Sequence, residues 1–324
     1  MPERAIHPAL RRVLQEAGDP ALVDKLAALP GSDLTTVLLE VQRRRAERVT
    51  PAEVMRNYGR DRFVGPASVG FGAQRRAEDA MLAALPDGFE VLTLAPVLPL
   101  GAHSAVATVD PRNMIATVRG SEVAADPTNG LALEAAARRR RTLAAGPRSA
   151  GLVRLAATQR VARAQQVSGP VSFAHFQLLG AVTAGRDTGG HAFERDSVAE
   201  HLGFAAAGLR RLGASRVRLE LTCLDPALSD VTAAVAGALA GARGVEVAAA
   251  PQRQSGRGYY TGLCFKVQAA FGGAELEIGD GGFTDWTMRL AANGKERLLI
   301  SGMGIDHLAA LAGLAGRTRS RSLA

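Results

Sequence analysis

The chain has 324 residues, of which 47% are hydrophobic and 22% charged, and its 39 basic residues exceed its 31 acidic residues by eight charges. This composition excludes global disorder and fits one large or two ordinary domains. Its two cysteines, Cys223 and Cys264, are too few for a disulfide framework or a four-cysteine metal site, which favours a reducing compartment. Without an apolar leader or a run of 18 apolar residues, membrane insertion is not expected, and we expect a cytoplasmic protein.

The positive net charge favours acidic partners, which include nucleic acid, nucleotides and acidic proteins. Charge alone does not choose among these classes. Two arginine runs, at residues 138–141 and 317–321, are typical of solvated surfaces, with docking of an acidic partner as the alternative.

The first 60 residues are predicted to be helical. A helix is expected to begin at Thr50, because Thr50-Pro51-Ala52-Glu53 combines an N-cap threonine, a proline in the first turn and a glutamate three residues later. A further helix is predicted over residues 72–85, followed by strand-forming residues at 89–98.

After this point consecutive strands dominate the pattern. Strands are predicted at 104–109 and 114–118, joined by a turn, and a helix begins after Asp126-Pro127 and ends near Gly146. The remaining elements follow in chain order: strands at 152–159 and 173–182, a helix at 194–212, a strand at 215–223, a helix at 226–242, strands at 245–250, 259–270, 274–279 and 297–301, and a short helix from Ile305.

Strands joined without intervening helices cannot be parallel, because a parallel crossover needs a dozen or more residues. The predicted fold class is therefore α+β, with a large, mostly antiparallel sheet flanked by helices and a helical N-terminal extension. We expect residues 1–60 to form the extension and residues 61–324 to form one catalytic-size core.

Three glycine-bearing segments are candidates for binding. Residues 255–262 place Arg257 between glycines ahead of Tyr259 and Tyr260, which suits carboxylate or phosphate recognition, with a surface turn as the alternative. The segment 279–286 is a glycine cluster after a strand in which Glu275 and Glu277 share one face; these carboxylates could hold Mg²⁺ or simply face solvent. Residues 300–307 form a strand–glycine–helix junction suited to a phosphate or a base.

Taken in order, these segments and the paired strands around residue 165 resemble the catalytic core of class II aminoacyl-tRNA synthetases. The similarity is greatest to the histidyl-tRNA synthetase branch and its non-charging paralogues. It extends over residues 50–315, and it implies a fold of the predicted class, ATP and Mg²⁺ as cofactors, an amino acid or small carboxylate as substrate, and a homodimer formed through the helix at 72–85 and the strand after it.

The resemblance also implies roles for particular residues. Arg257 would contact the amino acid carboxylate and the α-phosphate, Arg160 would be the second arginine on that phosphate, and Glu122 would take the substrate ammonium group. The implied nucleotide-binding residues are Arg163, Phe176, Glu275, Glu277, Gly302, Gly304 and His307, with Glu275 and Glu277 as Mg²⁺ ligands. The other implied substrate-binding residues are Arg119, Gln177, Tyr259, Tyr260, Gly281, Gly282 and Asp285.

Two departures from the family pattern alter the expected activity. The arginine that grips the γ-phosphate is replaced by His307 or Asp306, and the glutamate usual after the first phosphate-binding arginine is Ala162. We also expect no anticodon-binding domain. The leading hypothesis is an ATP-dependent ligase that activates an amino acid or small carboxylate as an adenylate and passes it to an acceptor other than standard tRNA, such as an acidic carrier protein. The alternatives are a non-catalytic amino-acid-binding regulatory subunit and a nucleic-acid-binding protein.

Overall fold

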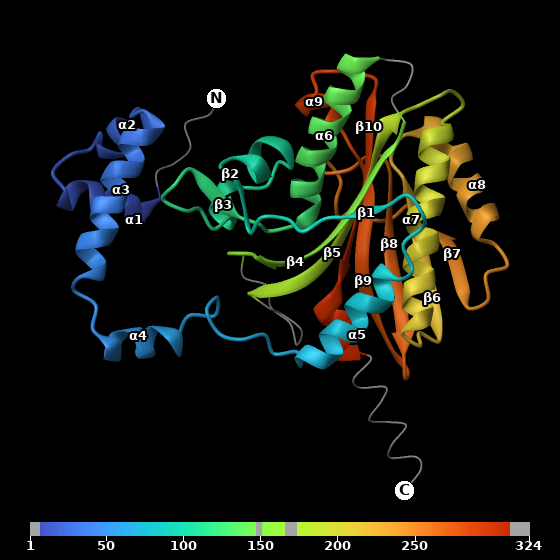
Figure 1. Cartoon of the computed structure of the whole chain (residues 1–324), viewed down its shortest axis with the longest axis horizontal. Helices are drawn as coiled ribbons and strands as arrows, with labels where there is room; N and C mark the ends of the chain where they lie inside the picture. The colour runs from blue at the N-terminus through green and yellow to red at the C-terminus, as the bar shows by residue number, and fades with distance from the viewer. Residues whose placement is uncertain (1–6, 147–150, 166–173, 312–324) are drawn as a thin grey trace, which may run out of the picture. The chain divides into compact units, whose positions relative to one another are not determined.

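The computed structural model describes residues 7–146, 151–165 and 174–311 (Figure 1). The chain divides into two compact units, one made of residues 1–61 with 116–121 and the other of residues 62–115 and the chain from residue 122 onward. The arginine run at 317–321 lies outside the described residues. No helix among the described residues is long and apolar enough to cross a membrane.

The first unit contains the predicted N-terminal helices. They are α1 (Pro8–Glu16), α2 (Leu22–Ala27), α3 (Gly31–Ala46) and α4 (Pro51–Tyr58). The helix predicted to begin after Thr50 is confirmed, and it has a complete capping box. The Glu53 amide donates to Thr50 Oγ1 over 3.3 Å, and the Thr50 amide donates to the Glu53 carboxylate over 2.8 Å. These bonds satisfy amide groups that the first helical turn leaves without partners.

The second unit is built on an eight-stranded sheet in the order β1-β4-β5-β10-β9-β8-β6-β7. Its strands are β1 (Glu90–Val91), β4 (Val153–Ala162), β5 (His175–Arg186), β6 (Arg216–Cys223), β7 (Val245–Ala249), β8 (Thr261–Phe271), β9 (Ala274–Thr284) and β10 (Glu296–Gly304). The two pairs at the edges, β1–β4 and β6–β7, are parallel, and every pair between them is antiparallel. The prediction of a mostly antiparallel sheet is confirmed.

Helices cover both faces of this sheet (Figure 1). Helix α6 (Pro127–Ala145) packs on β4 and β5 from one side, while α7 (Ala192–Arg211) and α8 (Ser229–Leu239) cover the other side, and α5 (Phe71–Leu82) packs on α7. Hydrophobic side chains fill both layers, with Leu131, Leu155 and Trp286 in the α6 layer and Leu202, Leu219 and Phe265 in the α7 layer. A shorter helix, α9 (Trp286–Leu290), precedes β10.

Two predicted strands are wrong. The first predicted strand is replaced by a π-helical turn, Ala102–Val106, and a short 3₁₀ turn, Pro111–Asn113, follows it. Residues 114–118 are irregular apart from one bridge residue at position 116. The strand propensity of the valines is overridden by burial of His103, which is 1% exposed and bonded to Glu122. The short strands β2 (Val97–Pro99) and β3 (Ser121–Val123) pair in a separate two-stranded sheet.

The glycine cluster after residue 279 is also not a loop, because Gly279 to Thr284 continue β9. Glycine is required there by close packing between strands. A Cβ on Gly279 would lie 2.1 Å from the Gly302 carbonyl oxygen, and one on Gly281 would lie 2.4 Å from the Ile300 carbonyl oxygen. The predicted strand–glycine–helix junction is confirmed, since β10 ends at Gly304 and residues 305–311 are helical.

A buried ion network fixes the C-terminal half of α6 to the sheet. Both Arg139 and Glu296 have fully buried side chains joined by bonds of 2.7 and 3.0 Å, and Arg186 donates to the same carboxylate over 2.8 Å. Burial alone would raise the pKa of Glu296, but the hydrogen bonds from Arg139 and Arg186 outweigh it and hold that pKa below its usual value.

Glu296→Gln should therefore lower the free energy of unfolding by about 3 kcal/mol, because it leaves two arginines without their counter-charge in the interior. The contribution of Glu296 is present above the unfolded pKa of about 4.3 and is lost as the pH falls through the lowered folded value. Urea denaturation at pH 7 measures the effect. Asp79→Asn, which removes an exposed partner of Arg75, is the control and should change stability little; equal effects would contradict the prediction.

Candidate functional site

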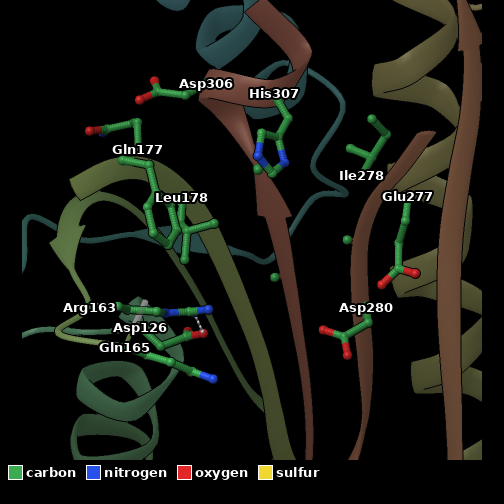
Figure 2. A pocket seen from close by; sticks show the side chains of 14 residues that line it. Asp126, Arg163, Gln165, Gln177, Leu178, Glu277, Ile278, Asp280, Asp306 and His307 are labelled. Carbon is green, nitrogen blue, oxygen red and sulfur yellow. Dashed lines mark hydrogen bonds and ion pairs between the residues drawn. The ribbon is translucent and has the colours of Figure 1, made fainter. Parts of the chain in front are cut away.

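Two adjoining cavities lie beside the N-terminus of α6. The smaller has a volume of about 380 Å³ and the larger about 600 Å³. Five residues line both: Asp126, Arg163, Gln165, Asp280 and Gly302. Figure 2 shows the smaller cavity, with Glu277 and Asp280 on one side and Asp126, Arg163 and Gln165 on the other. The shared residues make the cavities two compartments of one site.

A β-bulge brings the two acidic residues of β9 to the same compartment. Glu277 lies opposite Gln268 of β8, and Asp280 lies opposite Lys266, with one extra β9 residue, Ile278, between these pairs. Because alternate residues of β8 share a face, the extra residue restores Asp280 to the face of Glu277. Without the bulge, the spacing of three would place these carboxylates on opposite sides of the sheet.

The start of α6 is held by bonds to the backbone of one residue. The Ala125 amide donates to His103 Nε2 over 3.1 Å, and its carbonyl accepts from Arg163 Nε over 2.9 Å. Asp126 then caps the helix, accepting from the Thr128 amide over 2.9 Å and from Arg163 over 3.2 Å. These bonds fix the orientation of the helix N-terminus that lines both cavities.

Glu122 belongs to this support structure. Its side chain is 3% exposed, and its carboxylate accepts from the His103 amide over 2.8 Å and pairs with His103 Nδ1 over 2.6 Å. Burial would raise the pKa of Glu122, but the hydrogen bonds from His103 outweigh it and the pKa is lowered. Glu122 therefore positions His103, which itself lines the larger cavity.

Acidic residues outnumber basic residues in the lining of the smaller cavity. Four acidic residues, Asp126, Glu277, Asp280 and Asp306, line it together with a single arginine, Arg163. Each carboxylate also has one basic partner: Asp126 pairs with Arg163, Glu277 with Lys266 at 2.6 Å, Asp280 with Arg253 at 3.0 Å and Asp306 with Arg160 at 3.4 Å. Of these four basic residues, only Arg163 is among the described residues that line the cavity, so acidic side chains outnumber basic ones in its lining.

Two of these carboxylates are in unfavourable surroundings, Asp280 because of burial and nearby negative charge and Asp306 because one oxygen lacks a hydrogen bond. The pKa of Asp280 is raised, first by burial and further by the negative charge of Asp126, although Arg253 opposes the shift. Asp306 is 2% exposed, and its Oδ1 atom has no hydrogen-bond partner among the described residues. An unsatisfied buried carboxylate oxygen is costly and calls for a donor.

The two arginines expected to act on one phosphate bind other groups. Arg160 contacts His175 over 3.0 Å, Gln74 over 3.1 Å and Asp306 over 3.4 Å. Arg257 donates to carbonyl oxygens of its own loop, those of Arg253 at 2.8 Å and Pro251 at 3.2 Å. Neither arginine is among the described residues that line the two cavities.

The other predicted site residues divide between the cavities and their surroundings. The smaller cavity is lined by Arg163, Phe176, Gln177, Glu277, Gly302, Gly304 and His307, and the larger by Arg163, Gly302, Tyr259 and Tyr260. Among described residues, Glu275, Gly281, Gly282 and Asp285 line neither cavity. Glu275 pairs with Arg216 at 2.5 Å, and Asp285 pairs with Arg289 at 3.7 Å. Arg119 belongs to the first compact unit, where its amide donates to Thr117.

Several lining residues were not predicted from the sequence. Asp126 was recognised only as a helix cap, and Asn129 and His103 carry no motif. Arg253 is the buried partner of Asp280, and its guanidinium lies 5.6 Å from the Tyr260 ring centroid. A usable signal was present at Asp280, because an aspartate between two glycines in a strand is unusual unless its carboxylate has a function.

The lining does not suit the ATP and Mg²⁺ expected from the resemblance. A triphosphate would meet four carboxylates and one arginine, whereas phosphate groups are bound by converging cations and amide donors. The described residues contain no group of three or more His, Cys, Asp or Glu placed to hold a metal ion, and Glu275 and Glu277 are each paired with a basic side chain.

Comparison with known proteins identifies the fold. The sequence matches no protein-family profile and no curated protein. The structure is similar to an ATP phosphoribosyltransferase regulatory subunit/histidyl-tRNA synthetase from Bacillus halodurans, with 14% identity, a TM-score of 0.55, and coverage of 75% of this chain and 79% of that one. It is also similar to a histidine–tRNA ligase subunit from Alicyclobacillus acidocaldarius, with 15% identity, a TM-score of 0.57, and coverage of 78% and 96%.

A third similar structure is the histidyl-tRNA synthetase of S. aureus, with 13% identity and a TM-score of 0.55, where the match covers 74% of this chain and 64% of that one. The fold is therefore that of the class II aminoacyl-tRNA synthetase catalytic core, as the resemblance in sequence implied. Identities of 13–15% establish this fold and leave the activity open.

The close approach of α6 to the sheet can be tested by substituting the glycine at the contact. A Cβ on Gly180 would lie 2.8 Å from Pro127 Cγ, whereas one on Gly302 would meet nothing within 4 Å. Gly180→Ala should therefore lower the free energy of unfolding by about 1–3 kcal/mol, because the helix N-terminus must shift. Gly302→Ala should be neutral or slightly stabilising. Equal stability of the two variants in urea would contradict this account of the packing.

Proposed function

We propose that the chain is a non-catalytic subunit that binds a free amino acid and regulates a partner enzyme. The single observation that carries this proposal is that the larger cavity offers partners for both charged ends of an amino acid, while the arginine expected to drive activation is bound to its own loop. The regulatory role follows the name of the similar Bacillus halodurans protein, and the partner would be an ATP phosphoribosyltransferase.

The lining of the larger cavity complements a zwitterion. Asp126 and Asp280 offer carboxylates to an ammonium group, and Arg163 offers a guanidinium to a carboxylate. Asn129, at the start of α6, is 3% exposed, and its amide nitrogen has no hydrogen-bond partner among the described residues. A buried donor of this kind is satisfied when a carboxylate oxygen of the ligand accepts from it. A volume of about 600 Å³ is sufficient for an amino acid.

Among the described residues, neither of the two arginines expected to act in adenylate formation lines the cavities. That reaction builds negative charge on an α-phosphate, and the protein must place cations over it. Arg257 instead satisfies the carbonyls of Arg253 and Pro251. The glycines on either side of Arg257 have φ values of +80° and +82°, so they serve the turn itself. This argues against a phosphate-binding role for the loop.

The second candidate is the ATP-dependent ligase. The observation that favours it is the presence of two adjoining cavities with five common lining residues, which is the arrangement that a two-substrate reaction needs. Phe176 also lines the smaller cavity, where an aromatic ring could stack on a base. Pyrophosphate exchange with ATP across the twenty amino acids tests it. We expect none, and exchange with any amino acid would replace the regulatory proposal by the ligase.

The remaining expectations on partners have the status of proposals. A homodimer through α5 follows from the fold class, and light scattering showing a monomer would exclude it. A cytoplasmic location is proposed from cysteine usage, and fractionation of cells tests it.

An acidic carrier protein as acceptor applies only to the ligase candidate. Binding of nucleic acid through the arginine-rich surfaces requires an affinity that falls as salt rises, which filter binding measures.

Asn129→Ala separates ligand binding from stability. The variant should bind the amino acid about tenfold more weakly, because one donor to the carboxylate is lost. Its stability without ligand should be unchanged or higher, since the substitution removes an unsatisfied buried donor and adds a better helix former. Isothermal titration calorimetry and urea denaturation measure the two effects.

Asn293→Ala, in the turn before β10, is the matched control and should leave affinity unchanged. If Asn129→Ala destabilises the protein without ligand and leaves affinity unchanged, Asn129 has a structural role and the proposed orientation of the amino acid is wrong. If no amino acid binds the natural protein and none alters phosphoribosyltransferase activity in a mixture of the two proteins, the proposed function fails.

A further inference from the structure

We propose that the smaller cavity binds the cationic group of an organic ligand, a primary amine or a guanidinium, at the position where the resemblance in sequence implies a nucleotide. The ligand class is an amino acid with a basic side chain, whose zwitterionic end occupies the larger cavity. The placement of the amino acid end in the larger cavity rests on the proposed function. The placement of the cationic group rests only on the lining of the smaller cavity.

The first support is the orientation of the carboxylates. Glu277 is held by Lys266, Asp280 by Arg253 and Asp306 by Arg160, and none of these three basic residues is among the described residues lining the cavity. Partners outside the lining fix the carboxylates in place without filling the cavity. A site prepared in this way loses little entropy when a cation binds.

The second support is the oxygen that lacks a partner. Asp306 follows directly on the junction of β10 with the C-terminal helix, lines the cavity, and is 2% exposed. Its Oδ2 is 3.4 Å from Arg160, while Oδ1 has no hydrogen-bond partner among the described residues. Oδ1 has no accessible surface in the cavity as the side chain stands, so the Asp306 carboxylate must turn toward the ligand before an N–H group of a bound amine or guanidinium supplies the missing donor.

The lining also distinguishes an organic cation from a metal ion. A Ca²⁺ or Mg²⁺ ion requires several oxygen ligands within about 2.6 Å of one point. No three acidic, histidine or cysteine residues of the described chain are grouped closely enough for this. Phe176, Leu178 and Ile278 line the same cavity and offer apolar contact to an alkyl stem. Spread carboxylates with apolar side chains between them suit an extended alkylammonium or guanidinium group.

The passage between the two cavities allows one ligand to occupy both. Gly302 lies on β10 between Gly180 and Asp280 and lines both cavities, and a Cβ placed there meets nothing within 4 Å. Glycine therefore keeps this passage open without being required by the packing of the strands. A larger residue at this position would narrow the passage and leave the sheet intact.

The test compares ligands that differ only in charge. Calorimetry of the natural protein with arginine and citrulline, and with lysine and norleucine, measures the effect of the side-chain cation at similar size. We expect each charged ligand to bind at least about tenfold more tightly than its neutral counterpart. Agmatine, which has no carboxylate, tests the smaller cavity alone and should bind, whereas ATP should not compete with it.

Two variants locate the cation site. Glu277→Gln should weaken arginine binding about tenfold and leave citrulline binding unchanged, because only the charged group contacts the carboxylate. Glu246→Gln, on the edge strand β7, is the control and should change neither. Gly302→Val should weaken arginine binding, which uses both cavities, and leave agmatine binding in the smaller cavity unchanged. The urea midpoint should stay within error of the natural protein, which shows that the loss is not due to unfolding.

The outcomes separate this inference from the proposed function. If citrulline and norleucine bind as tightly as arginine and lysine, the proposed function stands and the cation site is refuted. If agmatine binds and no amino acid does, the cation site stands and the proposed function fails. If agmatine, arginine and lysine all fail to bind, or if ATP displaces them, the cation site is refuted.

Discussion

The geometry of the site depends on the contact between the N-terminus of α6 and the centre of the sheet. Pro127 lies against Gly180, and only glycine allows this approach. Because the helix begins there, Asp126 and Asn129 reach the cavities from above the sheet while Asp280 and Glu277 reach them from β9. At the other end of the helix, Arg139 is fixed to Glu296. The helix is therefore fixed to the sheet at both ends.

Buried polar groups behind the cavity hold its lining in place. His103 and Arg163 fix the backbone of Ala125 from two sides, and Glu122 fixes His103. Each of these bonds is made by a side chain that is distant in sequence from its partner. A network of this kind is stable only when every member is satisfied. Among the buried side-chain atoms that have no partner in the described part of the chain, those of Asn129 and Asp306 are notable, since both residues line a cavity.

The sequence predicted the large elements of the fold well because their signals are local. The capping box at Thr50, the Asp126-Pro127 start of α6 and the long alternating strands are each encoded within a few residues. The strand predicted at residues 104–109 is absent because a non-local contact decides the structure there. His103 is buried against Glu122, which lies 19 positions further along the chain. The bulge that aligns Glu277 with Asp280 could not be predicted, since it is defined only by the register with β8.

Some of the residues predicted to form the site lie together in the structure, while their chemical roles stay predictions. Arg163, Phe176, Gly302 and His307 do come together, as the order of the motifs implied. The order of motifs along the chain does not determine the direction in which a side chain points. Arg257 is an example, because its guanidinium donates to carbonyl oxygens of its own loop. Once that guanidinium is satisfied locally, the carboxylates of β9 and α6 face the cavity with Arg163 alone among the lining arginines. The same fold can therefore carry a cavity lined by more acidic than basic side chains, because the scaffold that places the side chains is independent of their charge.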